Sequence, residues 1–185
     1  MITNKEDLKK CIKKDSCLLL GENRKERIAY MKRVKDTQYY IYVYLKYLRK
    51  EEYYRNTYKN NKFKILLALY YERRRNKLGK SLGFYMEANC CGEGLNIFHY
   101  GSIVINPSAR IGKNCRLHGN NCIGNNGITD KSPIIGDNVD IGFGAVIIGD
   151  ILVADNITIG ANALVNKSFT EPGITIAGVP AKKVK

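Results

Sequence analysis

The sequence predicts an α+β protein with a helical N-terminal domain, residues 1–83, and a left-handed parallel β-helix of about five coils, residues 84–185. Charge and composition divide the chain at this boundary. Residues 1–83 hold 23 Lys and Arg against 9 Asp and Glu, and 11 of the 13 tyrosines. Residues 84–185 hold 8 basic and 8 acidic residues, and 14 of the 17 glycines. A six-residue repeat runs through the second part only.

The first part has the composition of helices, because it is rich in Lys, Glu, Leu and Arg and contains no proline. Gly21 and Gly79 are expected near helix ends. The apolar run 39–48 could also be a buried strand, since periodicity does not separate the two for a short run. Its charged flanks favour a helix packed between neighbours. We therefore expect helices over 5–14, 23–35, 37–56 and 61–77.

The repeat consists of eight blocks that each open with Ile, Leu or Val. They are IGKNCR (111–116), LHGNNC (117–122), IGNNGI (123–128), IGDNVD (135–140), IGFGAV (141–146), IIGDIL (147–152), VADNIT (153–158) and IGANAL (159–164). The first residue is expected to point into the core, and the small second residue permits a sharp corner. Asn and Asp at many fourth positions suit left-handed turns. Two extra residues between Ile97 and Ile105, and the turn-rich loop 124–133, interrupt the pattern.

Several classes of protein are excluded by composition. No apolar stretch reaches the ~20 residues of a membrane helix, and the N-terminus lacks the apolar region of a signal peptide. The six cysteines form no CxxC pair, so we expect reduced, mostly buried thiols in a cytoplasmic protein with no metal site. The basic surface could bind nucleic acid or an anionic membrane. Without a nucleic-acid-binding motif, a solvated helical surface is favoured and no nucleic-acid partner is expected.

Three stretches resemble the hexapeptide-repeat acyltransferases, most closely the serine O-acetyltransferase branch and its capsular-sugar acetyltransferase relatives. They are HYGSIVINPSARIGKNC (99–115), IGFGAVIIGDILVADNITIGANALV (141–165) and AGVPAKKV (177–184). The resemblance implies an acetyl-CoA-dependent O-acetyltransferase without a covalent enzyme intermediate, active at clefts between the subunits of a homotrimer. The flat faces of a triangular coil also favour threefold association, which would cover their apolar surface.

The two histidines of the chain are the candidate acid–base residues. A neutral imidazole suits removal of a hydroxyl proton at cellular pH. His99 lies in the interruption after Ile97, where the backbone is pushed outward, and the family's catalytic histidine falls at this position. We expect His99 to be the general base; the alternative is a structural histidine at a corner. Leu117 falls one coil after Ile97, so His118 is expected ~4.8 Å from the neighbourhood of Phe98 and His99. His118 would orient the acceptor, or be a polar corner residue.

Two departures from the resemblance concern the acceptor. Phe98 stands where serine acetyltransferases carry an aspartate, and their second histidine is missing at about Ser132. Both losses weaken the case for L-serine and are compatible with a sugar hydroxyl, so both acceptors stay open. A non-enzymatic β-helix scaffold is the competing class of function. The loop residues Asn125, Asn126 and Gly127 are expected to line the active site, or to form a plain surface loop.

The resemblance also indicates where acetyl-CoA binds, along an edge of the β-helix. Gly144, Ala145 and Ala163 match family positions where small side chains leave room for the pantetheine arm. Lys167, Lys182 and Lys183 are expected to meet the phosphates. No metal is required for this chemistry.

Overall fold

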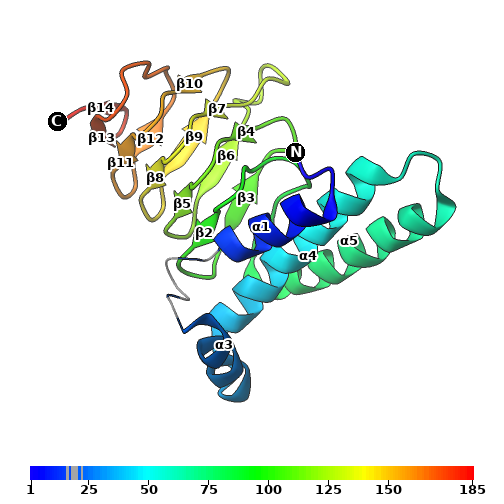
Figure 1. Cartoon of the computed structure of the whole chain (residues 1–185). Coiled ribbons are helices and arrows are strands. Elements are labelled where there is room, and N and C mark those ends of the chain that lie inside the picture. Colours follow the sequence, from blue (N-terminus) through cyan, green and yellow to red (C-terminus); the bar gives the residue numbers. More distant parts are fainter. Residues whose placement is uncertain (16, 18–20, 22) are drawn as a thin grey trace.

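The computed structural model describes residues 1–15, 17, 21 and 23–185. Its helices lie at one end of a stack of short strands, and two long helices project from the stack as an antiparallel pair (Figure 1). The helices are α1 (Lys5–Lys14), α3 (Arg24–Arg33), α4 (Thr37–Thr57) and α5 (Lys62–Leu82). In the described ranges, no helix combines the length and apolar character needed to cross a bilayer.

The predicted helices are confirmed, including the helical interpretation of the apolar run 39–48, which lies within α4. Polar side chains fix where three of them begin. Asn4, Asp36 and Asn61 precede α1, α4 and α5, and the side chain of each accepts backbone N–H groups of the first turn. Local capping therefore sets where these three helices begin.

The predicted end of the last helix, at residue 77 near Gly79, is wrong. The helix α5 continues to Leu82 and ends at Gly83, whose φ of 79° is left-handed. Gly79 lies buried inside α5, where a Cβ atom would be 2.7 Å from the carbonyl oxygen of Phe84 and 3.2 Å from the ring of Tyr44. Its small size serves close packing of the helix on the strand that follows.

The strands form three sheets, which are the three faces of a parallel β-helix. Face A contains β1 (Phe84–Tyr85), β3 (Ile103–Ile105), β6 (Cys122–Gly124), β9 (Val146–Ile148) and β12 (Leu164–Val165). Face B contains β4 (Arg110–Ile111), β7 (Ile134–Ile135) and β10 (Leu152–Val153). Face C contains β2 (Asn96–Ile97), β5 (Arg116–Leu117), β8 (Asp140–Ile141), β11 (Thr158–Ile159), β13 (Thr175–Gly178) and β14 (Ala181–Lys183). Among the strands of the described residues, β14 alone pairs antiparallel, with β13.

The register of the strands confirms the predicted repeat. Ile97 pairs with Leu117, and Ile105 pairs with Ile123, so the chain between Ile97 and Ile105 is longer by two residues than its counterpart one coil later. Face C has five parallel strands in succession, in agreement with about five coils. The left-handedness of the coil stays a prediction.

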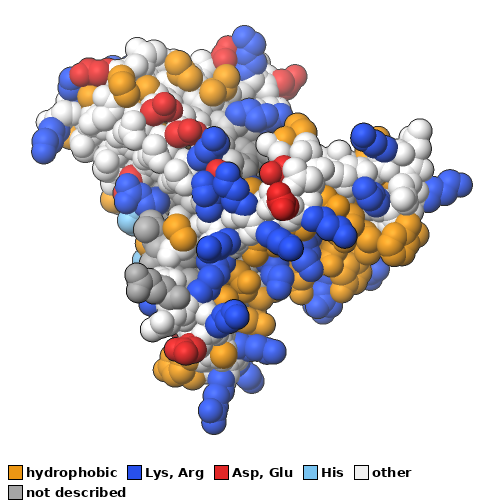
Figure 2. All heavy atoms as spheres, viewed as in Figure 1, with side chains coloured by type: hydrophobic (Ala, Val, Ile, Leu, Met, Phe, Trp, Pro, Cys, Tyr) orange, Lys and Arg blue, Asp and Glu red, His pale blue; other side chains and the backbone are white. Residues whose placement is uncertain are grey.

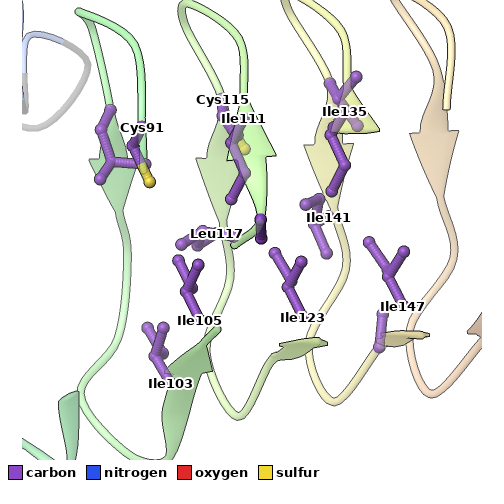
Figure 3. Close-up of a cluster of buried hydrophobic side chains, with 14 of the residues drawn as sticks. Cys91, Ile103, Ile105, Ile111, Cys115, Leu117, Ile123, Ile135, Ile141 and Ile147 are labelled. Atoms are coloured by element: carbon purple, nitrogen blue, oxygen red, sulfur yellow. The ribbon is translucent and has the colours of Figure 1, made fainter. Parts of the chain in front are cut away.

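The first residue of each block points into the core, as predicted. Figure 3 shows these aliphatic side chains stacked in columns between the strands. The same buried cluster includes Ile41, Tyr44, Leu45 and Leu48 of α4, so one core continues from the β-helix into the helical part. Burial of this apolar surface is the main stabilising contribution to the fold.

Asparagines at the fourth block position adopt left-handed backbone, also as predicted. Asn114, Asn138 and Asn156 have φ of 56°, 59° and 60°. Their amides form a ladder along one corner: Asn114 donates to Asn138 at 2.9 Å, and Asn138 donates to Asn156 at 3.1 Å. Asparagine therefore both permits each turn and joins one coil to the next.

A buried arginine of α4 joins the helices to the first coil. The Arg49 guanidinium contacts the carboxylates of Asp15 and Glu52, with shortest distances of 2.8 and 3.0 Å. It also donates to the carbonyl oxygens of Cys91 at 2.8 Å and Gly92 at 2.5 Å. Burial alone would lower the pKa of Arg49, but the two carboxylates outweigh it and hold that pKa well above its ordinary value.

Candidate active site

His99 lies at the corner where face C of the first coil turns into face A, within the interrupted segment. Its side chain is exposed, as expected for a group that meets a substrate. No described residue hydrogen-bonds to its ring, so both ring nitrogens are available to a ligand. The geometry therefore permits acid–base chemistry at His99.

A glycine of the next coil packs closely beside His99. A Cβ atom at Gly119 would lie 3.3 Å from the Cβ of His99 and 3.1 Å from the ring of Phe143 in the third coil. Phe143 is 44% exposed. A side chain at residue 119, whose φ is 118°, would therefore crowd both His99 and Phe143.

His118 lies one coil beyond Phe98, which confirms the predicted layer. The two rings pack with centroids 4.8 Å apart and planes tilted by 30°. The direct ring contact of His118 is thus with Phe98, the residue that immediately precedes His99. Phe98 supports the second imidazole instead of supplying a carboxylate to the first.

His118 is oriented by a carboxylate that the sequence interpretation missed. Its Nε2 lies 2.7 Å from Oδ1 of Asp140, and Oδ2 of Asp140 lies 3.2 Å from Nη2 of Arg116. Asp140 and Arg116 are paired in register on face C, each directly before an inward aliphatic residue. Counting the repeat could have found this neighbour. An imidazole held by a carboxylate at one nitrogen is an arrangement suited to a general base.

The helical part also contributes to this corner. Gln38, in the first turn of α4, donates from Nε2 to the carbonyl oxygen of Phe98. Its Oε1 is buried and has no hydrogen-bond partner among the described residues. The backbone that carries His99 is therefore fixed from outside the β-helix. No pattern in the sequence indicates this contact.

The loop expected to line the site lies at a different corner of the same chain. Residues 125–133 connect face A to face B, whereas His99 lies between face C and face A. Asn125 and Asn126 accept backbone N–H groups within the loop, from Gly127 at 3.3 Å and from Ile128 at 3.0 Å. Within one chain, the structure does not bring the loop and His99 together.

The small residues predicted for acetyl-CoA have structural reasons of their own. Ala145 and Ala163 are 0% and 1% exposed, so their methyl groups face the core. Gly144 has φ of 74°, and a Cβ atom there would lie 2.1 Å from Oδ1 of Asn162. Of the three, only Gly144 presents a partly exposed surface at the corner that carries His99.

The three predicted lysines are exposed but do not lie together. Lys182 and Lys183 belong to β14, at the edge of face C, and Nζ of Lys183 lies 2.6 Å from Oε1 of Glu171. Lys167 lies between face A and face B, and its Nζ is 5.5 Å from the ring centroid of Phe169. Lys182 and Lys183 pair with Ala177 and Ile176 in the last coil of face C, the face whose first coil leads to His99. Lys167 instead lies at the corner that carries the loop 125–133.

The cysteines are free thiols and mostly buried, as predicted. Burial raises the pKa of Cys115 to about 12 and that of Cys91 well above its ordinary value. Such thiols stay protonated and are poor nucleophiles at neutral pH. Among the described residues, no His, Cys, Asp and Glu side chains gather as a metal-binding group.

Comparison with known proteins gives one consistent group of relatives. No family model matches the chain. The serine acetyltransferase of Buchnera aphidicola subsp. Schizaphis graminum is 35% identical over 97 residues, which are 51% of this chain and 37% of the relative. That of Staphylococcus xylosus is 36% identical over 96 residues, 51% of this chain and 44% of the relative. The chain is serine acetyltransferase-like. It matches less than half the length of these curated relatives.

Solved structures show the same similarity. The crystal structure of Neisseria gonorrhoeae serine acetyltransferase superposes with a TM-score of 0.65 at 25% identity, covering 97% of this chain and 68% of that one. Soybean serine acetyltransferase complexed with serine gives a TM-score of 0.62 at 25% identity, covering 76% of this chain and 56% of that one. The first match extends over the helical part as well as the β-helix.

Proposed function

We propose that the protein is an acetyl-CoA-dependent O-acetyltransferase in which His99 is the general base. The observation that carries the proposal is the exposed imidazole of His99 at the interrupted corner, without a hydrogen-bond partner among the described residues, in a chain that is serine acetyltransferase-like. This combination supplies a proton acceptor that an acceptor hydroxyl can reach from solvent.

The acetyl group passes directly from the thioester to the acceptor hydroxyl, through a tetrahedral species. The neutral His99 ring accepts the proton of the acceptor hydroxyl as the oxygen attacks the acetyl carbonyl carbon. The tetrahedral species collapses, the carbon–sulfur bond breaks, and the imidazolium returns its proton to the departing thiolate. The products are an O-acetyl ester and coenzyme A. The protonated, buried cysteines are consistent with direct transfer and no acyl-cysteine.

Acetyl-CoA fits the edge between face C and face A. This edge starts at His99, passes Gly144 in the third coil and reaches Lys182 and Lys183 at β14. Coil spacings of ~4.8 Å give it a length of about 19 Å, enough for an extended pantetheine arm. The reactive thioester would then lie at His99, and the lysines would meet phosphates as point charges.

A homotrimer through face A would complete the site. The outward positions of this face form one apolar column in register: Tyr85, Val104, Cys122, Val146 and Leu164. The corresponding positions of face C are Asn96, Arg116, Asp140, Thr158 and Thr175. Three copies with face A toward a common axis place the loop 125–133 and Lys167 of one copy beside His99 of the next.

The acceptor is L-serine or a sugar hydroxyl. One of the similar structures is named as a complex with serine, which favours the amino acid. The surroundings of His99 favour a sugar as the second candidate. Phe98 and the exposed Tyr100 and Phe143 offer aromatic surfaces, and Ser132 is buried and presents no charge. The apolar faces of a sugar ring would pack on such surfaces.

The decisive experiment measures thiol release from acetyl-CoA with a panel of serine and sugar acceptors. We expect His99→Ala to lower kcat by about 10²–10⁴-fold while the circular dichroism spectrum is unchanged. His118→Ala and Asp140→Asn are assayed beside it. If these two lose as much activity as His99→Ala, and His99→Gln retains it, the base is His118 and our assignment is wrong.

Two further outcomes would overturn the proposal. Wild-type protein that releases no thiol above background with any acceptor, and is not retained on a CoA-affinity resin, is a scaffold and not an enzyme. Light scattering that gives the mass of one chain at micromolar concentration would contradict the shared site.

A further inference from the structure

The solvent-facing side of α5 is apolar along its first half. Phe63, Leu66, Leu69 and Tyr70 are 51–68% exposed, and Ile65 is 40% exposed. In Figure 2, hydrophobic side chains gather along the lower edge of the α4–α5 pair, with Lys and Arg side chains on both sides. Exposed apolar clusters of this kind mark interaction surfaces on soluble proteins.

Packing within the chain does not use this side of α5. The buried residues of the helix, Ala68, Arg75, Gly79 and Leu82, lie on the opposite side. Arg75 there pairs with Glu51 of α4 at 2.7 Å. The residues from Phe63 to Tyr70 on the outer side follow helical spacing, so they form one continuous surface. We call this surface, Phe63, Ile65, Leu66, Leu69 and Tyr70, the apolar half of α5.

The second half of the same side is basic. Arg73, Lys77 and Lys80 are exposed, and none of them pairs with a carboxylate among the described residues. The acidic residue of α5, Glu72, is engaged by Arg55 of α4 at 3.0 Å. A shallow groove of about 480 Å³ is lined by Leu69, Glu72, Arg73, Asn76, Lys77 and Lys80. The groove therefore begins in the apolar half and extends among unpaired cations.

We propose that this side of α5 docks onto an anionic lipid bilayer. The apolar half would enter the boundary between headgroups and acyl chains, and Arg73, Lys77 and Lys80 would contact lipid phosphates along the groove. A surface that combines apolar side chains with unpaired cations matches the chemistry of such a bilayer.

The charge of the helical part argues against the other occupants. A second copy would bring two like-charged surfaces together, because residues 1–83 carry a net charge of +14. Nucleic acid would satisfy the cations but would leave Phe63, Leu66 and Leu69 without an apolar partner. An anionic bilayer satisfies both halves at once.

The test is flotation of the full-length protein with vesicles. Phosphatidylcholine vesicles are compared with vesicles of phosphatidylcholine and phosphatidylglycerol at low and high salt. We expect binding to the anionic vesicles only, weakened by salt. The double variant Arg73→Glu/Lys77→Glu should bind the anionic vesicles at least about tenfold more weakly than the wild type. Leu66→Glu should also lose binding.

A matched control carries the same change of charge on another helix. Lys5→Glu/Lys9→Glu, on α1, should retain binding, and all variants should retain the circular dichroism spectrum and thiol release of the wild type. If the α1 variant loses as much vesicle binding as the α5 variant, the loss follows from the change in net charge alone, and the proposal is overturned. An absence of flotation would also overturn it, as would a larger assembly in solution that Leu66→Glu dissociates, because the face would then be covered by a second copy.

Discussion

The two halves of the molecule are stabilised in different ways. In the β-helix, the same contact recurs in every coil: an aliphatic side chain stacks on its equivalent in the next coil, and asparagines repeat along a corner. In the helical half, the decisive contacts occur once. Arg49, Asp15 and Glu52 form one buried ionic cluster, and Arg75 with Glu51 forms a second one with different partners. Where the same contact recurs in every coil, the stability depends little on any one residue. Where a contact occurs once, the stability depends strongly on the residues that make it.

Removal of the buried cation Arg49 is expected to destabilise the protein most. We expect Arg49→Met to lower the free energy of unfolding by about 3–5 kcal/mol, because Asp15 and Glu52 would be left as uncompensated buried charges. Chemical denaturation measures the loss. Hydrogen exchange should show early opening of the helices and first coil, with the last coils still protected.

Arg55→Met is the matched control for this change. Arg55 is also an α4 arginine, but its side chain is 44% exposed, and its partner Glu51 keeps Arg75 at 2.7 Å. We expect a loss of less than about 1 kcal/mol. Equal losses in the two variants would mean that the buried cluster is not what holds the halves together.

A cavity in the β-helix should lower the free energy of unfolding somewhat less than the loss of Arg49. Ile141 is fully buried in the middle coil, between Leu117 and Ile159. We expect Ile141→Ala to lower the free energy of unfolding by about 3 kcal/mol, with protection from hydrogen exchange reduced in the neighbouring coils. Thr158→Ala, outward on the adjacent strand, should stay within about 0.5 kcal/mol. A uniform loss of protection over the whole chain would contradict the view that contacts in the β-helix are local.

The smallest effect concerns a surface link between the halves. Nζ of Lys14 lies 2.7 Å from Oε1 of Glu93, and this hydrogen bond holds the pKa of Glu93 below its ordinary value. A lowered pKa means that the carboxylate stabilises the fold above the ordinary value, about 4.5, and that this contribution is lost as pH falls below it. We expect Glu93→Gln to cost less than about 1 kcal/mol at neutral pH.

Unfolding curves of both proteins across acidic pH check the sign. The difference between wild type and Glu93→Gln should shrink as pH falls through the range in which Glu93 gains a proton. A difference that grows on acidification would contradict the assigned role of Lys14.

The two halves also differ in how far the sequence predicts them. The period of six gave the coils, the two-residue interruption before Ile105 and the layer of His118, because each follows from counting. The end of α5 was misplaced, since the packing of Gly79 on Phe84 depends on a contact outside the helix. Arg49 could not be assigned to Asp15 because nothing periodic links α4 to the end of α1.

The candidate site shows the same division. His99 and His118 were found from the repeat and the resemblance, and Asp140 was within reach of the same counting. Gln38 was not, because its contact with the backbone of Phe98 joins the aperiodic half to the periodic one. The loop 125–133 and His99 lie at different corners of the β-helix. Spacing in the sequence does not show which corner each segment occupies.

Both ends of the coil stack are partly covered by other segments of the chain. At the first coil, the Arg49 guanidinium donates to the carbonyl oxygens of Cys91 and Gly92. Asp15 accepts the backbone N–H groups of Gly94 and Leu95. At the last coil, β14 folds back antiparallel on β13. Open strand edges recruit further strands, and a β-helix with bare ends would polymerise into fibres. The contacts of Arg49 and Asp15 at one end and of β14 at the other reduce the open edge available for such pairing.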